Sequence, residues 1–510
     1  MKILKHRITE NQHFKMATLI ILGPPGTGKT TTLLDLVDKC LADKINPNKI
    51  GFISFTKKSI EEAKGRACAR FNKNNDDFIY FRTIHSLAFR QLGMSPSEVM
   101  QRNHYREIGY SLGLKVTGYQ STDKDFYEMN KGDQMIFMES LSRLCCEEYR
   151  FTYERMNPDF SWQEFDLFIR SIKKYKEVKL LWDFTDMLQR FHDSGVKPEF
   201  DSLFIDEAQD LCRLQWKIID QLVLKTKNTY IAGDDDQAIF RWSGADIEHF
   251  IDISNKSNKK ILSKGYRLPK KVHDISSLLS KRISNRVVKD FKPTSQVGKV
   301  EFISRLDAVD ISKGEWLLLV RNSYLERDII SYLRVSGFSY ESRYDNSNNV
   351  ESLRAALNWE KLRKGQILLV KEAKIIVSFT AIKSEKPLKD LQDEDEIDLE
   401  KFVKKTGIDP DKKWYEALDE ISYEDRGYYL MARKQGESLI GKPRIKISTI
   451  HGAKGGECAN VIVLTDISAK TYKGMMRNPD DEIRVFYVAL TRAKESLYIV
   501  QPQTNSFFNI

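Results

Sequence analysis

The chain has few cysteines and no long apolar run. Its 510 residues contain six cysteines, of which Cys145 and Cys146 are adjacent and the others are scattered. That spacing argues against a zinc site and against a disulfide framework. No stretch of about eighteen apolar residues occurs, and the N-terminal segment lacks the apolar core of a secretory signal. We therefore expect a cytoplasmic protein without membrane association.

The charge balance is basic rather than neutral. The chain has 82 Lys and Arg against 72 Asp and Glu, which gives a formal net charge of +10. Such an excess favours a polyanionic partner such as nucleic acid, although a soluble protein with a merely basic surface has the same balance. The length is too great for one hydrophobic core and predicts three or four domains.

A glycine-rich loop follows the apolar run from Thr18 to Leu22 and precedes a helical pattern. This context predicts a phosphate-binding loop, in which backbone N–H groups and a helix N-terminus hold the phosphates of a nucleoside triphosphate. Lys29 adds a positive charge at the phosphates, and Thr30 supplies a hydroxyl for Mg²⁺. We assign nucleotide binding to Gly23, Pro24, Pro25, Gly26, Thr27, Gly28, Lys29, Thr30 and Thr31.

Two adjacent carboxylates end a second apolar strand. The run from Ser202 to Ile205 leads directly into Asp206 and Glu207. Asp206 is placed to hold the water shell of the metal, and Glu207 to orient and deprotonate the attacking water. Such a pair alone is usually the start of a solvated loop. Together with the phosphate loop it predicts a catalytic site for hydrolysis.

Further polar residues suit the same nucleotide. Gln237 follows another strand end, where its amide can contact the γ-phosphate or the attacking water. Arg267 and Arg492 lie where a second domain can face the nucleotide, although in isolation each is more often a surface residue. A pair of guanidinium groups there would couple hydrolysis to domain closure. Tyr266 is placed to stack on the base, and Glu457 to accept a hydrogen bond from a ribose hydroxyl.

A second group of residues suits nucleic acid. Trp242 follows Arg241. An exposed aromatic beside an arginine suits stacking on a base, which contributes roughly 1–3 kcal/mol. A lone tryptophan is usually a core residue, but its closeness to Gln237 favours stacking. His85 and His451 have no carboxylate or thiol at ligand spacing, so we reject a metal role for them. We assign nucleic-acid contacts to Phe55, Thr56, Lys57, Thr83, His85, Phe240, Trp242 and His451.

Short β-rich runs alternate with helical patterns along the chain, which predicts parallel α/β sheets. The predicted strands are 18–22, 50–55, 203–206, 229–232, 316–320, 445–448, 460–464 and 496–500. About 170 residues separate the phosphate loop from Asp206, too many for a simple connection. We predict a first α/β domain at 1–88 and 197–255 with a helical insertion at 89–196. A second α/β domain at 256–343 and 443–510, whose strands start near Ile261, contains a second insertion at 344–442. The acidic run from Asp390 to Glu396 is expected to be a solvated loop.

These segments resemble, in order, the motifs of UvrD/Rep-like superfamily 1 DNA helicases: GPPGTGKT, FTKKS, RTIHS, DEAQD, GDDDQAIFRW, GYR, TIHGAKGGE and VALTRAK. The resemblance extends from about Leu19 to Lys494, and both insertions are shorter than in the well-studied bacterial members, which suggests a compact member. It implies two RecA-like P-loop NTPase domains, each with an inserted, mainly helical subdomain. ATP and Mg²⁺ would lie between them, with single-stranded DNA across both.

The resemblance implies an ATP-dependent DNA helicase that moves 3′ to 5′ as a monomer on single strands and at junctions with duplex, in replication, recombination or repair. The residues assigned above then take the nucleotide and DNA roles. Ser243, Phe240 and Gly456 depart from the Arg, Tyr and Leu common in the family. Gln12 lies nearer the phosphate loop than the family's adenine-reading glutamine, so the adenine contact is not assigned.

Two alternatives stay open on the sequence alone. The first is a single-stranded DNA translocase that displaces bound proteins without unwinding, because the motifs are common to both activities. The second is an ATP-dependent switch or scaffold protein, against which the intact Glu207, Arg267 and Arg492 argue.

Overall fold

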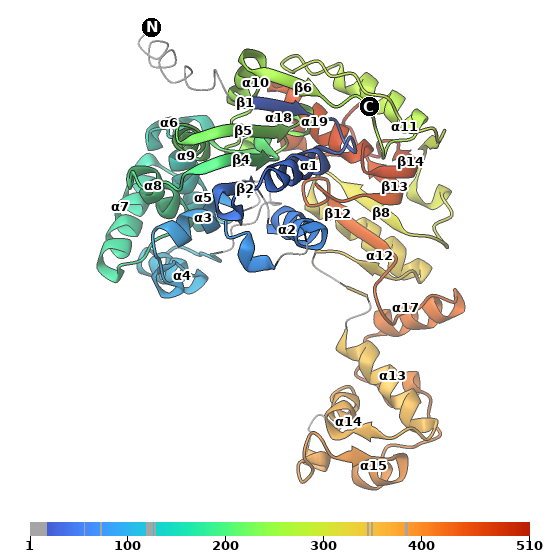
Figure 1. Cartoon of the computed structure of the whole chain (residues 1–510). Helices are drawn as coiled ribbons and strands as arrows, with labels where there is room; N and C mark the ends of the chain where they lie inside the picture. Colours follow the sequence, from blue (N-terminus) through green and yellow to red (C-terminus); the bar gives the residue numbers. More distant parts are fainter. Residues whose placement is uncertain are drawn as a thin grey trace.

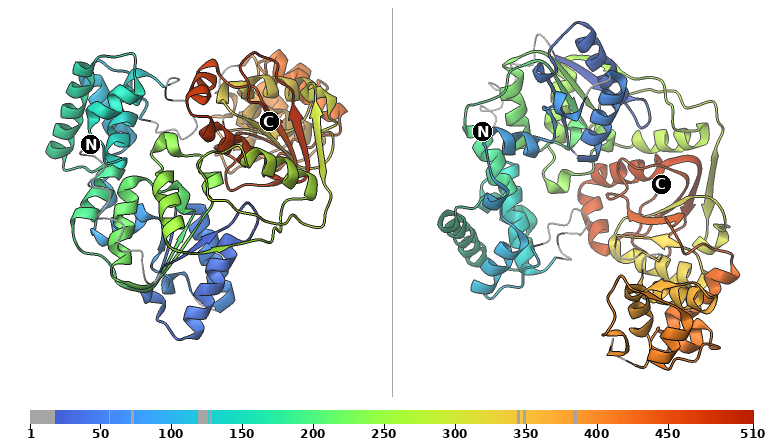
Figure 2. Two further views of the ribbon diagram at one scale, coloured as in Figure 1. Left: turned by 90° about the horizontal axis from the view of Figure 1, so that it is seen from above. Right: turned by 60° about the horizontal axis from the view of Figure 1, so that its bottom comes forward.

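Two sheets lie side by side in the molecule, with a lobe of helices beside the first sheet and an arm that projects from the second (Figures 1 and 2). The computed structural model describes residues 18–55, 57–71, 74–118, 126, 129–343, 346–347, 350–382 and 386–510. The arm, at the bottom of Figure 1, contains α13 (Glu351–Arg363), α14 (Val370–Val377) and α15 (Leu399–Thr406).

The first sheet is parallel throughout its described strands. In spatial order these are β3 (Phe81–Arg82), β2 (Ile50–Ser54), β4 (Phe200–Asp206), β5 (Thr226–Gly233), β1 (Thr18–Leu22) and β6 (Asn258–Ile261). The helices against it are α1 (Lys29–Ala42), α2 (Lys57–Phe71), α9 (Arg213–Val223) and α10 (Ile247–Lys256). The motif segments therefore follow the carboxyl ends of neighbouring strands, where α/β proteins bind ligands.

Alternation along the strands builds a hydrophobic core on each face of this sheet. Phe52 and Phe204 pack with α1 and α2 in one core. Ile53, Leu203 and Ile205 point the opposite way and pack with α9 and α10. Both faces are covered, as expected for a parallel sheet, so its strands read as nearly continuous apolar runs.

The edge strand β6 corrects one sequence prediction. We expected the second set of strands to begin near Ile261, but β6 pairs in parallel with β1, with Ile261 opposite Leu22. The boundary at 256 thus assigns this strand to the wrong sheet. All four residues of β6 are exposed, so they carry no apolar pattern that could indicate which sheet they join.

The elements described between β3 and β4 are mainly helical. They are α3 (Ile84–Gln91), α4 (Arg102–Ser111), α5 (Lys131–Leu144), α6 (Tyr149–Met156), α7 (Trp162–Lys179) and α8 (Phe184–Asp193). Helices α4, α5 and α7 share a core of their own, which includes Ile108, Met135, Met138, Phe165 and Phe168. Helices α3 and α8 instead pack into the core of the first sheet.

The second sheet is also parallel in its described strands. In spatial order these are β7 (Lys299–Ile303), β14 (Ala493–Val500), β13 (Cys458–Leu464), β8 (Trp316–Val320), β12 (Ile445–Thr449) and β9 (Tyr340–Glu341). Its helices are α11 (Lys270–Ser280), α12 (Glu326–Ser336), α18 (Ala469–Arg477) and α19 (Pro479–Leu490). The α/β class with two parallel sheets flanked by helices is thus confirmed.

The arm shares its core with the second sheet. It contains α13 (Glu351–Arg363), α14 (Val370–Val377), α15 (Leu399–Thr406), α16 (Trp414–Ala417) and the antiparallel pair β10 (Leu368–Leu369) and β11 (Glu396–Ile397), and α17 (Tyr423–Lys434) leads back to the sheet. Trp359 and Phe402 of the arm belong to the same buried cluster as Leu318 and Ile445 of the sheet. The acidic run at 390–396 is largely exposed, as predicted.

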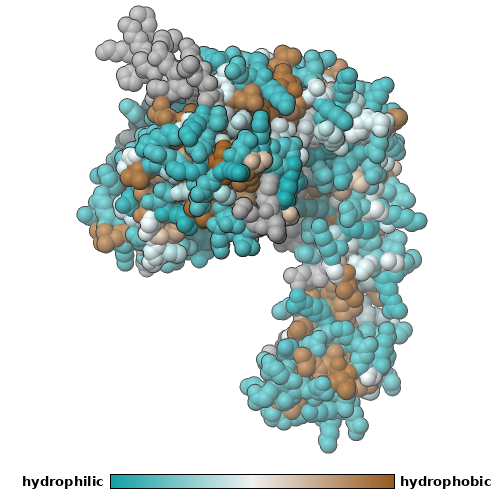
Figure 3. Space-filling model, viewed as in Figure 1, coloured by the Kyte–Doolittle hydropathy of each residue, from teal (hydrophilic) through white to brown (hydrophobic). Residues whose placement is uncertain are grey.

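Apolar residues are scattered over a mainly hydrophilic surface in the face shown in Figure 3. Within the described ranges, no helix combines the length and the apolar character that crossing a membrane requires.

Candidate functional site

The phosphate loop joins the end of β1 to the start of α1. Gly26 and Gly28 have φ angles of +71° and +84°, in the left-handed region where a side chain is costly. A Cβ on Gly23 would lie 2.4 Å from Cγ of Lys29, and one on Gly26 would lie 2.3 Å from Cβ of Arg267. The Nζ of Lys29 donates a hydrogen bond to the Gly23 carbonyl at 2.8 Å. The loop thus closes around Lys29 at the place where Arg267 approaches it.

The other loop residues keep this turn in place. Thr27 Oγ1 donates to the Pro24 carbonyl at 2.8 Å, and Pro24 and Pro25 are buried. Thr31 is exposed on the first turn of α1, where its hydroxyl accepts a hydrogen bond from Arg66 at 3.4 Å.

Thr30 and Asp206 meet across the sheet as the metal assignment requires. Thr30 Oγ1 donates to Asp206 Oδ2 at 2.7 Å. Burial, and then the charge of Glu207, raise the pKa of Asp206 to about 6, because a second negative charge in a desolvated place is unfavourable. Two oxygen ligands in an environment with excess negative charge fit Mg²⁺, which would keep this carboxyl ionised.

Glu207 has the strained backbone and the charge state of a general base. Its φ angle is +54°, a conformation that non-glycine residues adopt mainly where function requires it. Its Oε2 accepts a hydrogen bond from Gln209 at 2.5 Å. Burial favours a raised pKa, but Lys29, Lys454 and the Gln209 amide together outweigh it, so the pKa of Glu207 is lowered. The carboxylate is therefore ionised at neutral pH, as a base must be.

Gln237 lies between the two sheets. Its Nε2 donates to Asp234 Oδ2 at 2.7 Å, and its Oε1 accepts from Arg492 Nη2 at 3.2 Å. Burial, and then the charge of Arg267, lower the pKa of Arg492 to about 9. An anion placed beside these two guanidinium groups would relieve their repulsion. Gln237, Arg267 and Arg492, which are far apart in the sequence, thus meet beside the phosphate loop.

Tyr266 and Glu457 flank the same place. Tyr266 is 66% exposed, and its backbone N–H donates to the Gly26 carbonyl at 2.8 Å. Its ring therefore lies beside the phosphate loop with room for a stacking partner. Glu457, which we expected to accept from a ribose, has its Oε2 2.6 Å from Arg267 Nε. The structure thus pairs Glu457 with Arg267, which is itself assigned to nucleotide binding.

A row of aromatic rings runs from the first sheet to the second. Phe55 stacks on Phe240 with centroids 5.7 Å apart, and Phe240 lies 6.1 Å from His451. The His451 ring is 6.2 Å from Trp242, and Trp242 stacks on Phe137 of α5 at 5.8 Å and 18°. The row gathers four residues of the nucleic-acid assignment, from segments up to about four hundred residues apart in the sequence.

The environment of Trp242 corrects an expectation. We expected an exposed indole, but Trp242 is only partly exposed, because Phe137 lies nearly parallel to it. On the face that Phe137 covers, a base can stack on Trp242 by displacing Phe137 or by inserting between the two rings.

Both histidines of the assignment are neutral. Burial lowers the pKa of His85 to about 4 and that of His451 well below its ordinary value. His85 contacts Phe184 edge to face, with centroids 5.9 Å apart. Among the residues that the structure describes, His451 Nε2 has no hydrogen-bond partner. These rings can pack or form hydrogen bonds with a strand, but they offer no charge to phosphates near neutral pH.

The remaining assigned residues are dispersed. Thr83 caps α3 by accepting a hydrogen bond from Ser86 N at 3.2 Å, so its hydroxyl is used within the fold. Lys57 is exposed at the start of α2. Thr56 and Gln12 lie outside the described residues.

Lys454 is a functional candidate that the sequence analysis did not select. Its Nζ donates to Asp210 at 2.6 Å and to the Gln237 carbonyl at 2.7 Å, and it lies 5.0 Å from the centroid of the Phe240 ring. It therefore links the nucleotide residues to the aromatic row. The only sequence signal for Lys454 was its position as a cation within the glycine-rich segment TIHGAKGGE.

Phe137 is a second candidate that the sequence analysis did not select. It carried no signal in the sequence, because an aromatic residue in a helix usually belongs to a core.

Two family models match this chain. The model of the UvrD/REP helicase N-terminal domain matches residues 5–258, and that of the UvrD-like helicase C-terminal domain matches residues 445–500. A probable DNA helicase II homolog of Mycoplasma genitalium is 25% identical over 299 residues, which are 52% of this chain and 40% of that protein. The ATP-dependent DNA helicase PcrA of Bacillus subtilis is 24% identical over 300 residues, 53% of this chain and 38% of PcrA. The chain thus spans about 40% of the length of the curated relatives it matches.

Among solved structures, the chain is similar to the nonstructural protein 10 helicase of an arterivirus. That crystal structure is 12% identical with a TM-score of 0.34, and the match covers 96% of this chain and 60% of that chain. A complex of the same helicase with DNA gives 11% identity and a TM-score of 0.33, over 96% of this chain and 62% of that chain.

Proposed function

The chain belongs to the UvrD/Rep-like superfamily 1 helicases, and from this premise we propose that it is an ATP-dependent DNA helicase that moves along single-stranded DNA. Its substrates would be single strands and their junctions with duplex, and its direction 3′ to 5′. It would work as a cytoplasmic monomer in replication, recombination or repair.

One observation carries this proposal: the nucleotide residues and the aromatic row are joined through Gln237 and Lys454. Gln237 contacts Arg492 beside the phosphate loop, and the carbonyl of Gln237 accepts from Lys454, which lies over Phe240. A movement of Gln237 on hydrolysis would therefore displace Lys454 and Phe240, of which Phe240 belongs to the aromatic row that we assign to DNA contact. A helicase needs such a link, whereas a protein that only binds ATP does not.

The residues of the nucleotide set divide the work of hydrolysis. Lys29, Arg267 and Arg492 would neutralise the triphosphate, and Gln237 would orient the attacking water. Glu207, ionised and held by Gln209, would take the proton of that water. Mg²⁺, when bound by Thr30 and Asp206, would supply positive charge to the β- and γ-phosphates.

The experiment that tests the proposal is steady-state ATP hydrolysis with and without single-stranded DNA. We expect DNA to stimulate turnover strongly, and tailed duplexes then to be unwound. Lys29→Ala should abolish hydrolysis and reveals any contaminating ATPase. Glu207→Gln should keep ATP binding and lose turnover by orders of magnitude.

A rate of ATP hydrolysis that does not change when DNA is added would contradict a DNA-dependent motor and favour an ATP-dependent switch or scaffold protein. Strong stimulation without unwinding of any tailed duplex would instead identify a translocase that displaces proteins. Wild-type hydrolysis by Lys29→Ala would overturn the assignment of the site.

A further inference from the structure

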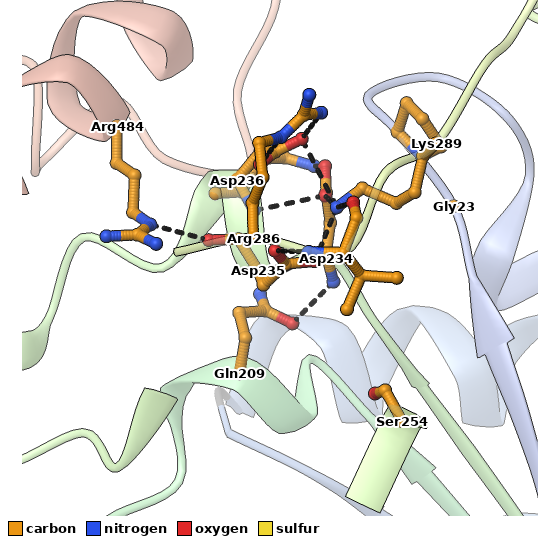
Figure 4. A network of polar contacts seen from close by, with 12 residues as sticks. Gly23, Gln209, Asp234, Asp235, Asp236, Ser254, Arg286, Lys289 and Arg484 are labelled. Carbon is orange, nitrogen blue, oxygen red and sulfur yellow. Dashed lines mark hydrogen bonds and ion pairs between the residues drawn. The ribbon is translucent and has the colours of Figure 1, made fainter. Parts of the chain in front are cut away.

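Three consecutive aspartates are buried between the two sheets. Asp234, Asp235 and Asp236 follow β5, are at most 1% exposed and lead directly into Gln237. Figure 4 shows them facing Arg286, Lys289 and Arg484, which come from the second half of the chain. Three carboxylates in a place without water are costly unless cations and donors meet them.

Lys289 is the centre of this network. Its side chain is fully buried, and its Nζ lies 3.1 Å from Asp234 Oδ1 and 3.2 Å from Asp236 Oδ2, and also contacts Asp235. Arg286 binds Asp236 through two nitrogens. Among the ion pairs of the described ranges, Lys289 is the sole cation paired with Asp234 or with Asp235.

Two further contacts, from the segment after α11 and from α19, fix the same turn. Val287 N donates to Asp235 Oδ2 at 2.8 Å. Arg484 of α19 donates to the Asp235 carbonyl at 2.9 Å and to the Asn285 carbonyl at 2.6 Å. The turn that precedes Gln237 is therefore held by elements outside the first sheet.

Asp234 connects this network to both hydrolytic residues. Its Oδ2 accepts from Gln237 Nε2 at 2.7 Å. Its backbone N–H donates to Gln209 Oε1 at 3.0 Å, and Gln209 Nε2 donates to Glu207. Burial alone would raise the pKa of Asp234, but Lys289 and Lys29 hold it below its ordinary value. Asp234 thus remains an ionised acceptor for the Gln237 amide.

We propose that Lys289 is a positioning residue for ATP hydrolysis: by pairing with Asp234 it orients Gln237 directly and Glu207 through Gln209. The inference rests on the proposed function, since it concerns the hydrolytic step of the same site. Buried ion clusters add little net stability compared with an apolar core, so stability alone does not account for six charged groups here. Lys289 lies in the segment between α11 and β7. The orientation of Gln237 and Glu207 therefore depends on the position of the second sheet relative to the first.

The test compares full-length variants by kcat and KM for ATP at saturating single-stranded DNA, with the affinity for DNA measured in parallel. Lys289→Met alone leaves buried carboxylates unpaired and can unfold the chain. The main variant is therefore Lys289→Met combined with Asp235→Asn, which keeps the buried charge balanced. Asp235→Asn alone retains the pair between Lys289 and Asp234. Lys281→Met is the matched control, because it makes the same change at an exposed lysine close by in the sequence.

We expect the double variant to lose about ten-fold or more in kcat, with KM for ATP and DNA affinity within about three-fold of wild type. Asp235→Asn and Lys281→Met should keep kcat within about three-fold. Equal kcat in the double variant and in Asp235→Asn would overturn the proposal. A parallel loss of kcat, ATP affinity and DNA affinity would overturn it too, because that is the signature of a structural role.

Asp234→Asn provides the second variant if the double variant does not fold by circular dichroism. Since Lys289 acts through the Asp234 carboxylate, this substitution should lower kcat in the same selective way, and an unchanged kcat would refute the proposal. The ATP turnover of the wild type distinguishes a failure of the proposed function from a failure of the role proposed for Lys289. If the wild type has no ATPase activity, the proposed function and the role of Lys289 are both overturned. If the wild type is active and the double variant has the same kcat as Asp235→Asn, only the role of Lys289 is overturned.

Discussion

At the residue scale, the partly buried His85 determines one response of the protein to pH. Burial lowers the pKa of His85 to about 4, whereas in the unfolded chain it lies near 6.5. The unfolded state therefore takes up a proton as the pH falls through 6.5, and the folded state does so only near 4. The stability that the neutral ring contributes at pH 7 is accordingly lost on acidification.

This difference gives a prediction for His85→Asn, which has no titrating ring. Between pH 7 and pH 5 the free energy of unfolding of the wild type should fall by up to about 2 kcal/mol more than that of the variant. Urea unfolding followed by circular dichroism at the two pH values measures the difference. An equal fall in both proteins would show that His85 is not held neutral by the fold.

Also at this scale, the sequence predicted those site residues whose signal is local. Lys29, Asp206 and Gln237 each follow an apolar strand at a spacing that is typical of nucleotide sites. Lys454 has no such signal, because its partner Asp210 lies 244 residues earlier in the chain. A contact of that separation exists only once the two sheets have folded and met, so periodicity and composition could not indicate it.

At the scale of elements, the stack of Phe137 on Trp242 joins α5 to the segment after β5. We predict that Trp242→Ala and Phe137→Ala each weaken binding of a single-stranded oligonucleotide, by roughly 1–3 kcal/mol if a base inserts between the rings. ATP affinity should change little, because neither ring contacts the phosphate loop. Fluorescence anisotropy of a labelled oligonucleotide measures the effect.

A matched control for this stack is Phe151→Ala. Phe151 lies on α6 of the same helical lobe and is 55% exposed, so its loss should leave DNA affinity unchanged. Tighter binding by Phe137→Ala would contradict insertion and show that Phe137 competes with the base for Trp242. Unchanged binding by Trp242→Ala would remove the aromatic row from the DNA path.

The positions of the apolar strands were predictable from the sequence, whereas the place of the polar strand β6 was not. The strands β1, β2, β4, β5, β8, β12, β13 and β14 were all expected within a few residues, because both faces of each sheet are buried. The exposed β6 was assigned to the wrong sheet, since only its pairing with β1 identifies its place.

At the scale of the whole molecule, the arm is joined to the second sheet by more than its two connections. Tyr428 of α17 is 3% exposed, and its hydroxyl donates to the Phe338 carbonyl at 3.0 Å. The guanidinium of Arg334 on α12 lies 5.1 Å from the centroid of the Tyr428 ring. A sequence that shows an insertion by its length cannot show this continuity, because the shared core forms from residues on both sides of the insertion.

The shared core predicts that the arm and the second sheet unfold as one cooperative unit. Tyr428→Ala would leave a cavity and an unpaired carbonyl, with a loss of ~3 kcal/mol. Hydrogen exchange should therefore accelerate in β8 and β12 as well as in α13 and α15, while β1 and β4 stay protected. Tyr423→Ala, at a 91% exposed position of the same helix, is the control that should change neither. Faster exchange confined to α13, α14 and α15 would show instead that the arm is an independent domain, free to move without any strain on the sheet that carries Arg492.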